Sequence, residues 1–226
     1  MTDTRSQILT TLKTALRRDQ RPPHAAEQRL RERPVNLVPE RGQGDHEDKI
    51  QLFSGEAQLV EASVVRISAL SAAPAAVTGF LGDHNLPSQV RVAPSLKDIA
   101  WATQPMLKAE QGLPQADDPT SITMAFGGVA ETGTLVFLSG PDNPTTLNYV
   151  TPNHIAVVAA QDIAGDYETV WGRIRAENKA PEGKFMPRTV SWVTGPSRSA
   201  DIEQTLLLGA HGPQRLHIVI VDEPQD

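Results

Sequence analysis

The residue best placed to do chemistry is Glu131, which lies in the stretch FGGVAETGTLVFL over residues 126–138. Its carboxylate follows apolar residues and precedes Thr132, Gly133 and Thr134. A carboxylate in such surroundings is suited to acid–base or nucleophilic work, and the glycines suit a close approach of the backbone. The alternative is a structural role, in which Glu131 turns to solvent or accepts backbone hydrogen bonds within its turn.

The same stretch does not have the pattern of a phosphate-binding loop. It matches neither GxGxxG nor GxxxxGKS/T, and residues 111–172 contain no lysine or arginine. An anion bound here would depend on backbone amides or on a cation from elsewhere in the chain. We expect that cation to be Arg198.

Arg198 belongs to a second stretch, GPSRSADIE over residues 195–203, which predicts a tight turn followed by a helix over 199–208. Ser197 or a later serine would cap this helix, and the amides of a helix N-terminus can hold an anion. Arg198 would add a bidentate contact to a carboxylate or a phosphate. Asp201 already complements the helix dipole, so the alternative is an ordinary capped helix in which Arg198 pairs with a local acid.

Two histidines complete the set of candidate groups. His211 lies in a third stretch, GAHGP over residues 209–213, and His154 opens an apolar strand. Together with Glu131 and Asp201 they offer imidazole and carboxylate ligands, but no HExxH motif or short paired spacing accompanies them. We therefore predict no metal site, because a histidine beside glycine and proline more often hydrogen-bonds the backbone of its loop.

The composition excludes several classes of protein. The chain has 226 residues, no cysteine and a formal net charge of −6. Disulfides, thiolate nucleophiles and cysteine-ligated metal or iron–sulfur sites are excluded, and we predict no cofactor. The negative charge argues against nucleic-acid binding. No run approaches the ~20 apolar residues of a membrane span, and the N-terminal sequence lacks the apolar centre of a signal peptide, so the expected location is cytoplasmic.

The charge is also uneven along the chain. Residues 1–34 carry eight Lys/Arg and four Asp/Glu, a net charge of +4, whereas the remainder carries −10. This basic segment could contact the acidic body or an acidic partner. The alternative is a solvated surface helix.

Periodicity predicts the elements that must position these groups. Residues 3–19 predict an amphipathic helix that Pro22-Pro23 ends, residues 24–33 a second short helix, and residues 34–48 a linker. The domain organisation is accordingly an N-terminal helical arm and linker over 1–46 and an α/β domain over 47–226.

The domain itself alternates helices and strands, which is typical of an α/β fold with a mostly parallel sheet. Its first half predicts helices from 47 and over 73–84, with strands over 63–67 and 89–93. Its second half predicts strands over 154–160, 189–194 and 216–221, with helices over 162–178 and 199–208. This second half reads as two right-handed crossovers in one parallel sheet. Ligands of such sheets bind beyond the carboxyl ends of the strands, where we expect the three stretches to meet.

Four motifs resemble those of the LUD family, also called the LutC/YkgG family of lactate utilisation proteins. They are AETGT over 130–134, PNHIAVV over 152–158, GPSRSADIE over 195–203 and LGAHGP over 208–213. The resemblance covers about residues 47–222. It implies a three-layer α/β/α fold of the NagB/RpiA/CoA-transferase-like superfamily. It also implies a role in oxidising L-lactate to pyruvate, beside partner subunits that carry iron–sulfur clusters.

Two functions follow. In the first, the chain is the cluster-free component of that system and binds a small carboxylate or a partner subunit, without activity of its own. In the second, it is a small-molecule enzyme of the CoA-transferase or isomerase type that uses Glu131 as nucleophile or base.

We predict a catalytic role for Glu131 and His211. The predicted ligand-binding residues are Thr132, Gly133, Thr134, His154, Ser197, Arg198 and Asp201. Arg198 would hold a carboxylate, His211 would donate or shuttle a proton, and Glu131 would orient or accept one.

Overall fold

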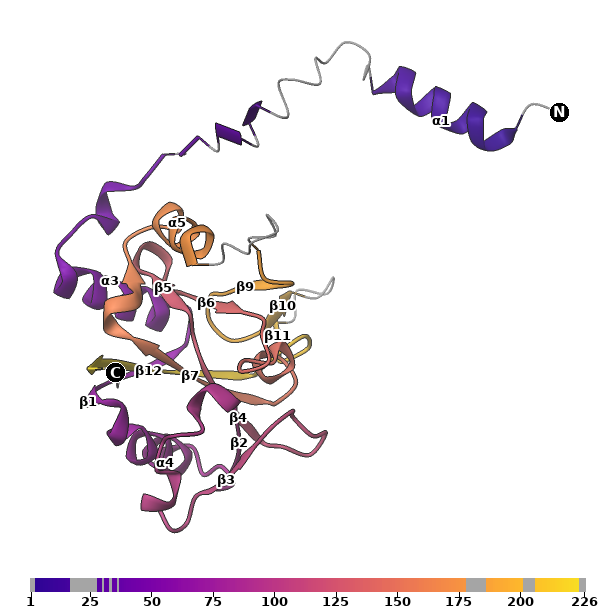
Figure 1. Ribbon diagram of the computed structural model, residues 1–226. Helices are drawn as coiled ribbons and strands as arrows, with labels where there is room; N and C mark the ends of the chain where they lie inside the picture. The colour runs from indigo at the N-terminus through magenta and orange to yellow at the C-terminus, as the bar shows by residue number, and fades with distance from the viewer. Residues whose placement is uncertain are drawn as a thin grey trace. The chain divides into compact units, whose positions relative to one another are not determined.

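Six strands form a central sheet, in the order β1–β12–β7–β4–β2–β3, in the computed structural model (Figure 1). Every neighbouring pair in it is parallel. The fold class, α/β with a mostly parallel sheet, is therefore confirmed. The strands are β1 (Ser63–Ala69), β2 (Gln89–Val92), β3 (Lys108–Gln111), β4 (Thr120–Met124), β7 (Asn153–Ala159) and β12 (Arg215–Glu223).

The structure describes residues 3–16, 28–29, 31–32, 34–35, 37–177, 186–200 and 206–223. The chain divides into two units, residues 1–38 and 39–226. The first unit contains α1 (Thr4–Ala15), where the sequence predicts a helix. Residues 17–19 of that predicted helix, the Pro22-Pro23 break and most of the predicted helix over 24–33 lie outside the described residues. None of the helices within the described ranges is both long and apolar enough to cross a membrane.

Helices cover both faces of the parallel sheet (Figure 1). On one face, α4 (Ala73–Asp83) packs its apolar residues against alternate residues of β1, β2, β4, β7 and β12. On the other face, α3 (His46–Leu59) packs against the intervening residues of β7 and β12. A capping box between Asp45 and Asp48 fixes the start of α3. Both helices agree with the predicted ranges.

A second sheet has four strands, in the order β8–β5–β6–β9, and packs against α3 (Figure 1). Its members are β5 (Gly127–Val129), β6 (Thr134–Leu138), β8 (Ile163–Ala164) and β9 (Val190–Val193). Because β9 pairs antiparallel with β6, it is absent from the parallel sheet. The prediction of two successive parallel crossovers over 154–221 is therefore wrong, although a strand does form at 190–193.

The structure also differs from the prediction at two of the predicted helices, those over 199–208 and 162–178. The helix over 199–208 is wrong, because β10 (Arg198–Ala200) pairs antiparallel with β11 (Leu206–Leu208). Residues 201–205, with Asp201 among them, lie outside the described residues. Helical spacing in a window of ten residues does not exclude a hairpin, whose partner strand the local pattern cannot show. The helix predicted from 162 is α5 (Tyr167–Glu177), which Asp166 starts by accepting a hydrogen bond from the Thr169 amide at 2.8 Å.

Short 3-10 turns connect these elements: η2 (Glu40–Gly42), η3 (Leu70–Ala72), η4 (Pro94–Leu96), η5 (Trp101–Thr103), η6 (Ala130–Thr132), η7 (Thr145–Asn148) and η8 (Ala160–Asp162).

A buried ion pair ties β2 to the start of β4. The Arg91 side chain is 6% exposed and that of Asp118 is 1% exposed. Two hydrogen bonds of 2.8 and 3.1 Å join the guanidinium to the carboxylate. The Arg91 guanidinium holds the pKa of Asp118 below its ordinary value. Glu110 approaches the same guanidinium at 3.2 Å, but its side chain is 59% exposed.

Asp118→Asn should lower the free energy of unfolding by about 3 kcal/mol, because it removes the buried counter-charge of the Arg91 guanidinium and leaves only the exposed Glu110. Urea titration at pH 7 measures the change. Glu110→Gln, which removes an exposed partner of the same arginine, is the control and should cost less than ~1 kcal/mol. Equal losses in the two variants would contradict the central role of the buried pair.

His154 is a core residue of β7, and its side chain is fully buried. Its Nε2 atom lies 2.7 Å from the Thr123 hydroxyl, and its ring packs at a tilt on Phe137 with the centroids 5.4 Å apart. Burial lowers the pKa of His154 from 6.5 to about 3. The residue is therefore neutral at physiological pH.

The lowered pKa predicts an acid-sensitive stability. Below pH 6.5 the unfolded chain takes up a proton at His154, whereas the folded chain does so only near pH 3. The free energy of unfolding should therefore be level above pH 6.5 and fall by up to ~1.4 kcal/mol per pH unit below it for this residue. Urea titrations from pH 8 to pH 5 give the slope. His154→Gln should reduce the slope, whereas His46→Gln at an exposed position should not, and an unchanged slope in His154→Gln would overturn the assignment.

Candidate functional site

The AETGT stretch forms the hairpin turn between β5 and β6. Its η6 turn ends at Gly133, whose φ of +61° favours glycine. A Cβ at this position would collide with the backbone nitrogen of Ala57 in α3. The turn therefore lies directly on the C-terminal half of α3.

A cluster of hydroxyl groups fixes the same turn. The Tyr167 hydroxyl lies 2.9 Å from that of Thr132 and 3.0 Å from that of Thr134. Thr134 also contacts the Thr194 hydroxyl at 2.7 Å. This last contact joins the AETGT turn to the residue that precedes GPSRSADIE.

Gly195 lies on the same end of α3 as Gly133. Its φ is +78°, and a Cβ there would come within 2.6 Å of the Val60 carbonyl oxygen. Ser197, two residues later, donates its amide proton to Pro213 at 2.8 Å and accepts one from the Gly209 amide at 3.0 Å. The His211 amide donates to the Ser197 hydroxyl at 3.4 Å. The structure thus brings all three stretches together.

The charged side chains are paired differently from the prediction. Arg198 forms an ion pair with Glu61 at 2.9 Å, an acid distant in the sequence rather than a local one. Glu131 is 8% exposed. Its amide donates to the Gly165 carbonyl at 3.2 Å. Among the described residues, its carboxylate has no hydrogen-bond or ion-pair partner.

The two histidines lie in different surroundings. His154 is in the core on the α3 face of the sheet, whereas His211 is exposed in the loop before β12. Within the part of the chain that the structure describes, no group of three or more histidine and acidic side chains is placed to hold a metal ion.

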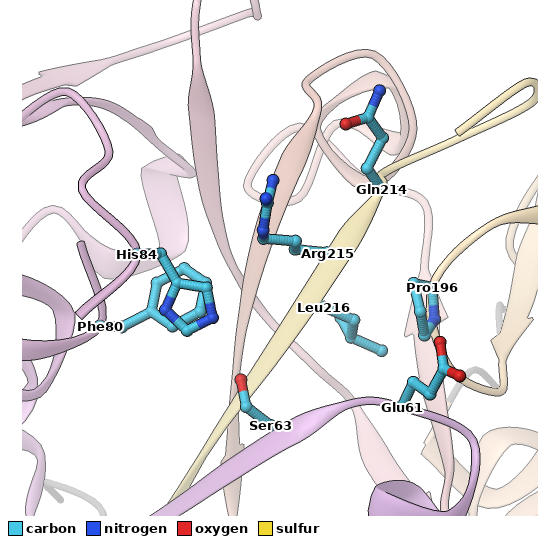
Figure 2. A pocket seen from close by; sticks show the side chains of 8 residues that line it. All are labelled: Glu61, Ser63, Phe80, His84, Pro196, Gln214, Arg215 and Leu216. Carbon is cyan, nitrogen blue, oxygen red and sulfur yellow. The ribbon is translucent and has the colours of Figure 1, made fainter. Parts of the chain in front are cut away.

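A pocket of about 260 Å³ opens beside the meeting point of GPSRSADIE and GAHGP (Figure 2). Its walls come from the starts of β1 and β12, from the end of α4, and from the loops before β12 and β10. They include Ser63, Phe80, His84, Pro196, Gln214 and Arg215. The pocket therefore lies at the amino edge of the parallel sheet, opposite the edge that the sequence predicts.

Two polar groups of the pocket are placed to contact a ligand, the guanidinium of Arg215 and the hydroxyl of Ser63. The hydrogen bond that the structure records for the Arg215 guanidinium is a long one, 3.4 Å to the Asn153 side-chain oxygen. The Ser63 hydroxyl lies 2.8 Å from Nδ1 of His217. Burial lowers the pKa of His217 to about 4, so this ring is neutral at physiological pH. Glu61 also lines the pocket, but its charge is offset by Arg198.

The sequence analysis did not single out Ser63 or Arg215. A usable signal for Arg215 is its position: it is the first residue of the last strand and follows GAHGP by one residue. Ser63 has no comparable signal, because only the pairing of β1 with β12 sets it opposite His217.

The chain is similar to bacterial proteins of about twice the matched length. It is 32% identical over 117 residues to Lactate utilization protein C of Bacillus subtilis (strain 168), covering 51% of this chain and 48% of that protein. It is 38% identical over 106 residues to an uncharacterized protein of Neisseria meningitidis serogroup B, covering 45% and 43%. The matched part thus spans about half the length of these curated relatives.

The fold has a counterpart among solved structures. A crystal structure of a DUF162 family protein from Deinococcus radiodurans matches with a TM-score of 0.58, covering 79% of this chain and 99% of that one. At 20% identity, this likeness concerns the fold alone. The sequence model of the LUD domain matches residues 50–221. Because that match takes in both helix-covered faces of the sheet and all three stretches, the chain belongs to the LUD domain family.

Proposed function

We propose that this chain is a component of an L-lactate utilisation system, and that it binds a small carboxylate or a partner subunit. The observation that carries the proposal is the match to several bacterial proteins named Lactate utilization protein C. The chain has no cysteine, so it supplies no thiolate for an iron–sulfur cluster, and clusters would belong to partner subunits. Its expected location is the cytoplasm.

The pocket supports a small ligand. At about 260 Å³ it is smaller than the ~300–1,000 Å³ of typical drug-sized sites. A guanidinium at its wall suits a carboxylate, since arginine binds carboxylates through paired, charge-assisted hydrogen bonds.

The N-terminal helix α1 is suited to binding a partner subunit. Within the N-terminal unit taken by itself, none of the residues of α1 is buried, and its apolar side chains Ile8, Leu9 and Leu12, with Leu16 just after it, are 47–56% exposed. They lie on one face at helical spacing, the arrangement by which helices dock into apolar grooves of other proteins. The net charge of +4 over residues 1–34 favours an acidic partner surface.

The enzyme alternative has weaker support. Glu131 is 8% exposed, and it is not part of the pocket wall. The segment around it, residues 111–172, has no lysine or arginine to bind the phosphates of coenzyme A or a sugar phosphate. The catalytic roles of Glu131 and His211, and the carboxylate-binding role of Arg198, stay predictions.

The purified chain should bind L-lactate, measured by isothermal titration calorimetry, but should not oxidise it when an artificial electron acceptor is supplied. A gentle affinity purification from the native organism should retain a cysteine-rich iron–sulfur protein. Turnover of lactate by the chain alone would contradict the accessory role. Recovery without any iron–sulfur partner, together with no binding of lactate, would contradict the whole proposal.

The exposed stripe of α1 should be needed for the partner. The double variant Leu9→Gln and Leu12→Gln should lower recovery of the iron–sulfur partner at least ~10-fold, because it removes two apolar anchors. Thr10→Gln with Thr14→Gln changes the opposite face of α1 and is the matched control. Equal recovery with both double variants would show that this stripe does not bind the partner.

A further inference from the structure

Arg215 and Ser63 project from the same face of the parallel sheet. Arg215 precedes His217 by two residues in β12, and His217 is the register partner of Ser63 in β1. Side chains two residues apart in a strand share a face, and neighbouring strands are about 4.8 Å apart. Arg215 and Ser63 are therefore diagonal neighbours on one face, offset by two residues along the strands. Figure 2 shows both side chains on the side of β12 where Phe80 of α4 lies, with the guanidinium extended away from the hydroxyl.

Among the acidic and basic side chains that line the pocket, Glu61 and Arg215, only Arg215 lacks an oppositely charged partner in the described residues. Glu61 brings a carboxylate to the pocket, but the Arg198 guanidinium lies 2.9 Å from it. Arg215 has no acidic partner within the described ranges. Its recorded hydrogen bond, to Asn153 at 3.4 Å, leaves most of the five N–H donors of a guanidinium unused. One surplus cation suits a monoanion better than a phosphate dianion.

Ser63 is held in place from behind. Its hydroxyl lies 2.8 Å from Nδ1 of His217. The His217 ring is stacked on Phe80, with ring centroids 4.3 Å apart and planes at 13°, and it is 6% exposed. A hydroxyl has one donor and two acceptor positions, so one contact to His217 leaves Ser63 able to bond a ligand oxygen in the pocket.

Apolar side chains also line the pocket, beside His84 and Gln214. Phe80, Pro196 and Leu216 line the pocket together with these polar groups. A ligand that satisfies both kinds of wall is short, carries one carboxylate, has an oxygen on the adjacent carbon and ends in a small apolar group.

We propose that this pocket binds a short 2-hydroxy monocarboxylate, with Arg215 holding the carboxylate and Ser63 the hydroxyl on the next carbon. L-lactate is the member of this class that follows from the proposed function, on which this inference rests. Of the motif stretches, only GPSRSADIE lines the pocket, through Pro196, and two side chains outside the motifs make the ligand contacts.

The first test is the affinity for L-lactate in full-length variants. Arg215→Gln should weaken binding about 10- to 100-fold, since it removes a charge-assisted pair. Arg215→Lys should recover part of the loss. Lys108→Gln is the matched control, because Lys108 begins β3 at the same sheet edge but at the opposite end of the strand order, and its affinity should equal that of the wild type.

The second test distinguishes a direct contact of Ser63 with the ligand from a purely structural role of this residue. Ser63→Ala should weaken L-lactate about 5- to 10-fold, because one hydrogen bond to the ligand is lost. Propionate, which lacks the 2-hydroxyl group, should bind Ser63→Ala as well as it binds the wild type. A purely structural role of Ser63 would weaken both ligands to the same degree.

The outcomes distinguish this inference from the proposed function. If the wild type binds L-lactate and Arg215→Gln binds it equally well, the ligand lies elsewhere and only the pocket assignment is overturned. If Ser63→Ala weakens both acids equally, the hydroxyl contact is overturned. If the wild type binds neither acid, both the pocket assignment and the carboxylate-binding part of the proposed function are overturned.

Discussion

The arrangement of this domain depends on the close approach of two glycine turns to the end of α3. Gly133 and Gly195 both have positive φ, and neither position has room for a Cβ. One lies against the backbone of Ala57 and the other against Val60. These two turns belong to the four-stranded sheet, while α3 covers the six-stranded sheet. The contact therefore fixes how the two sheets meet.

The rest of the site follows from this contact. With both turns on α3, the Thr134 and Thr194 hydroxyls come within 2.7 Å, and Glu61, directly after α3, reaches Arg198. Ser197 then bonds to the loop that leads into β12. The pocket at the starts of β1 and β12 lies beside these bonds, at the amino edge of the sheet.

The sequence predicted those parts of the domain that local patterns determine. Apolar periodicity located α3, α4, β1 and β7, because each buries a regular face or is buried on both faces. The pairing of β9 with β6, and the hairpin in place of a helix over 199–208, depend on partners distant in the chain, so local spacing could not show them. The meeting of the three stretches was expected. The partner of Arg198 was not, because Glu61 lies 137 positions away and its approach depends on Gly195.

The geometry also divides the roles of the family motifs and their neighbours. AETGT and GPSR supply backbone turns, hydroxyl contacts and one balanced ion pair, and these groups are largely engaged with one another. A group that is already satisfied by protein partners has little left to offer a ligand. Arg215 and Ser63 keep unused donors or acceptors and face the pocket. Glu131 is the exception within the motifs, since it is nearly buried and its carboxylate lacks a partner among the described residues. Its carboxylate oxygens are not among the buried, unpartnered side-chain atoms of the described residues, so they keep contact with solvent and stay outside the hydroxyl cluster that braces the turn.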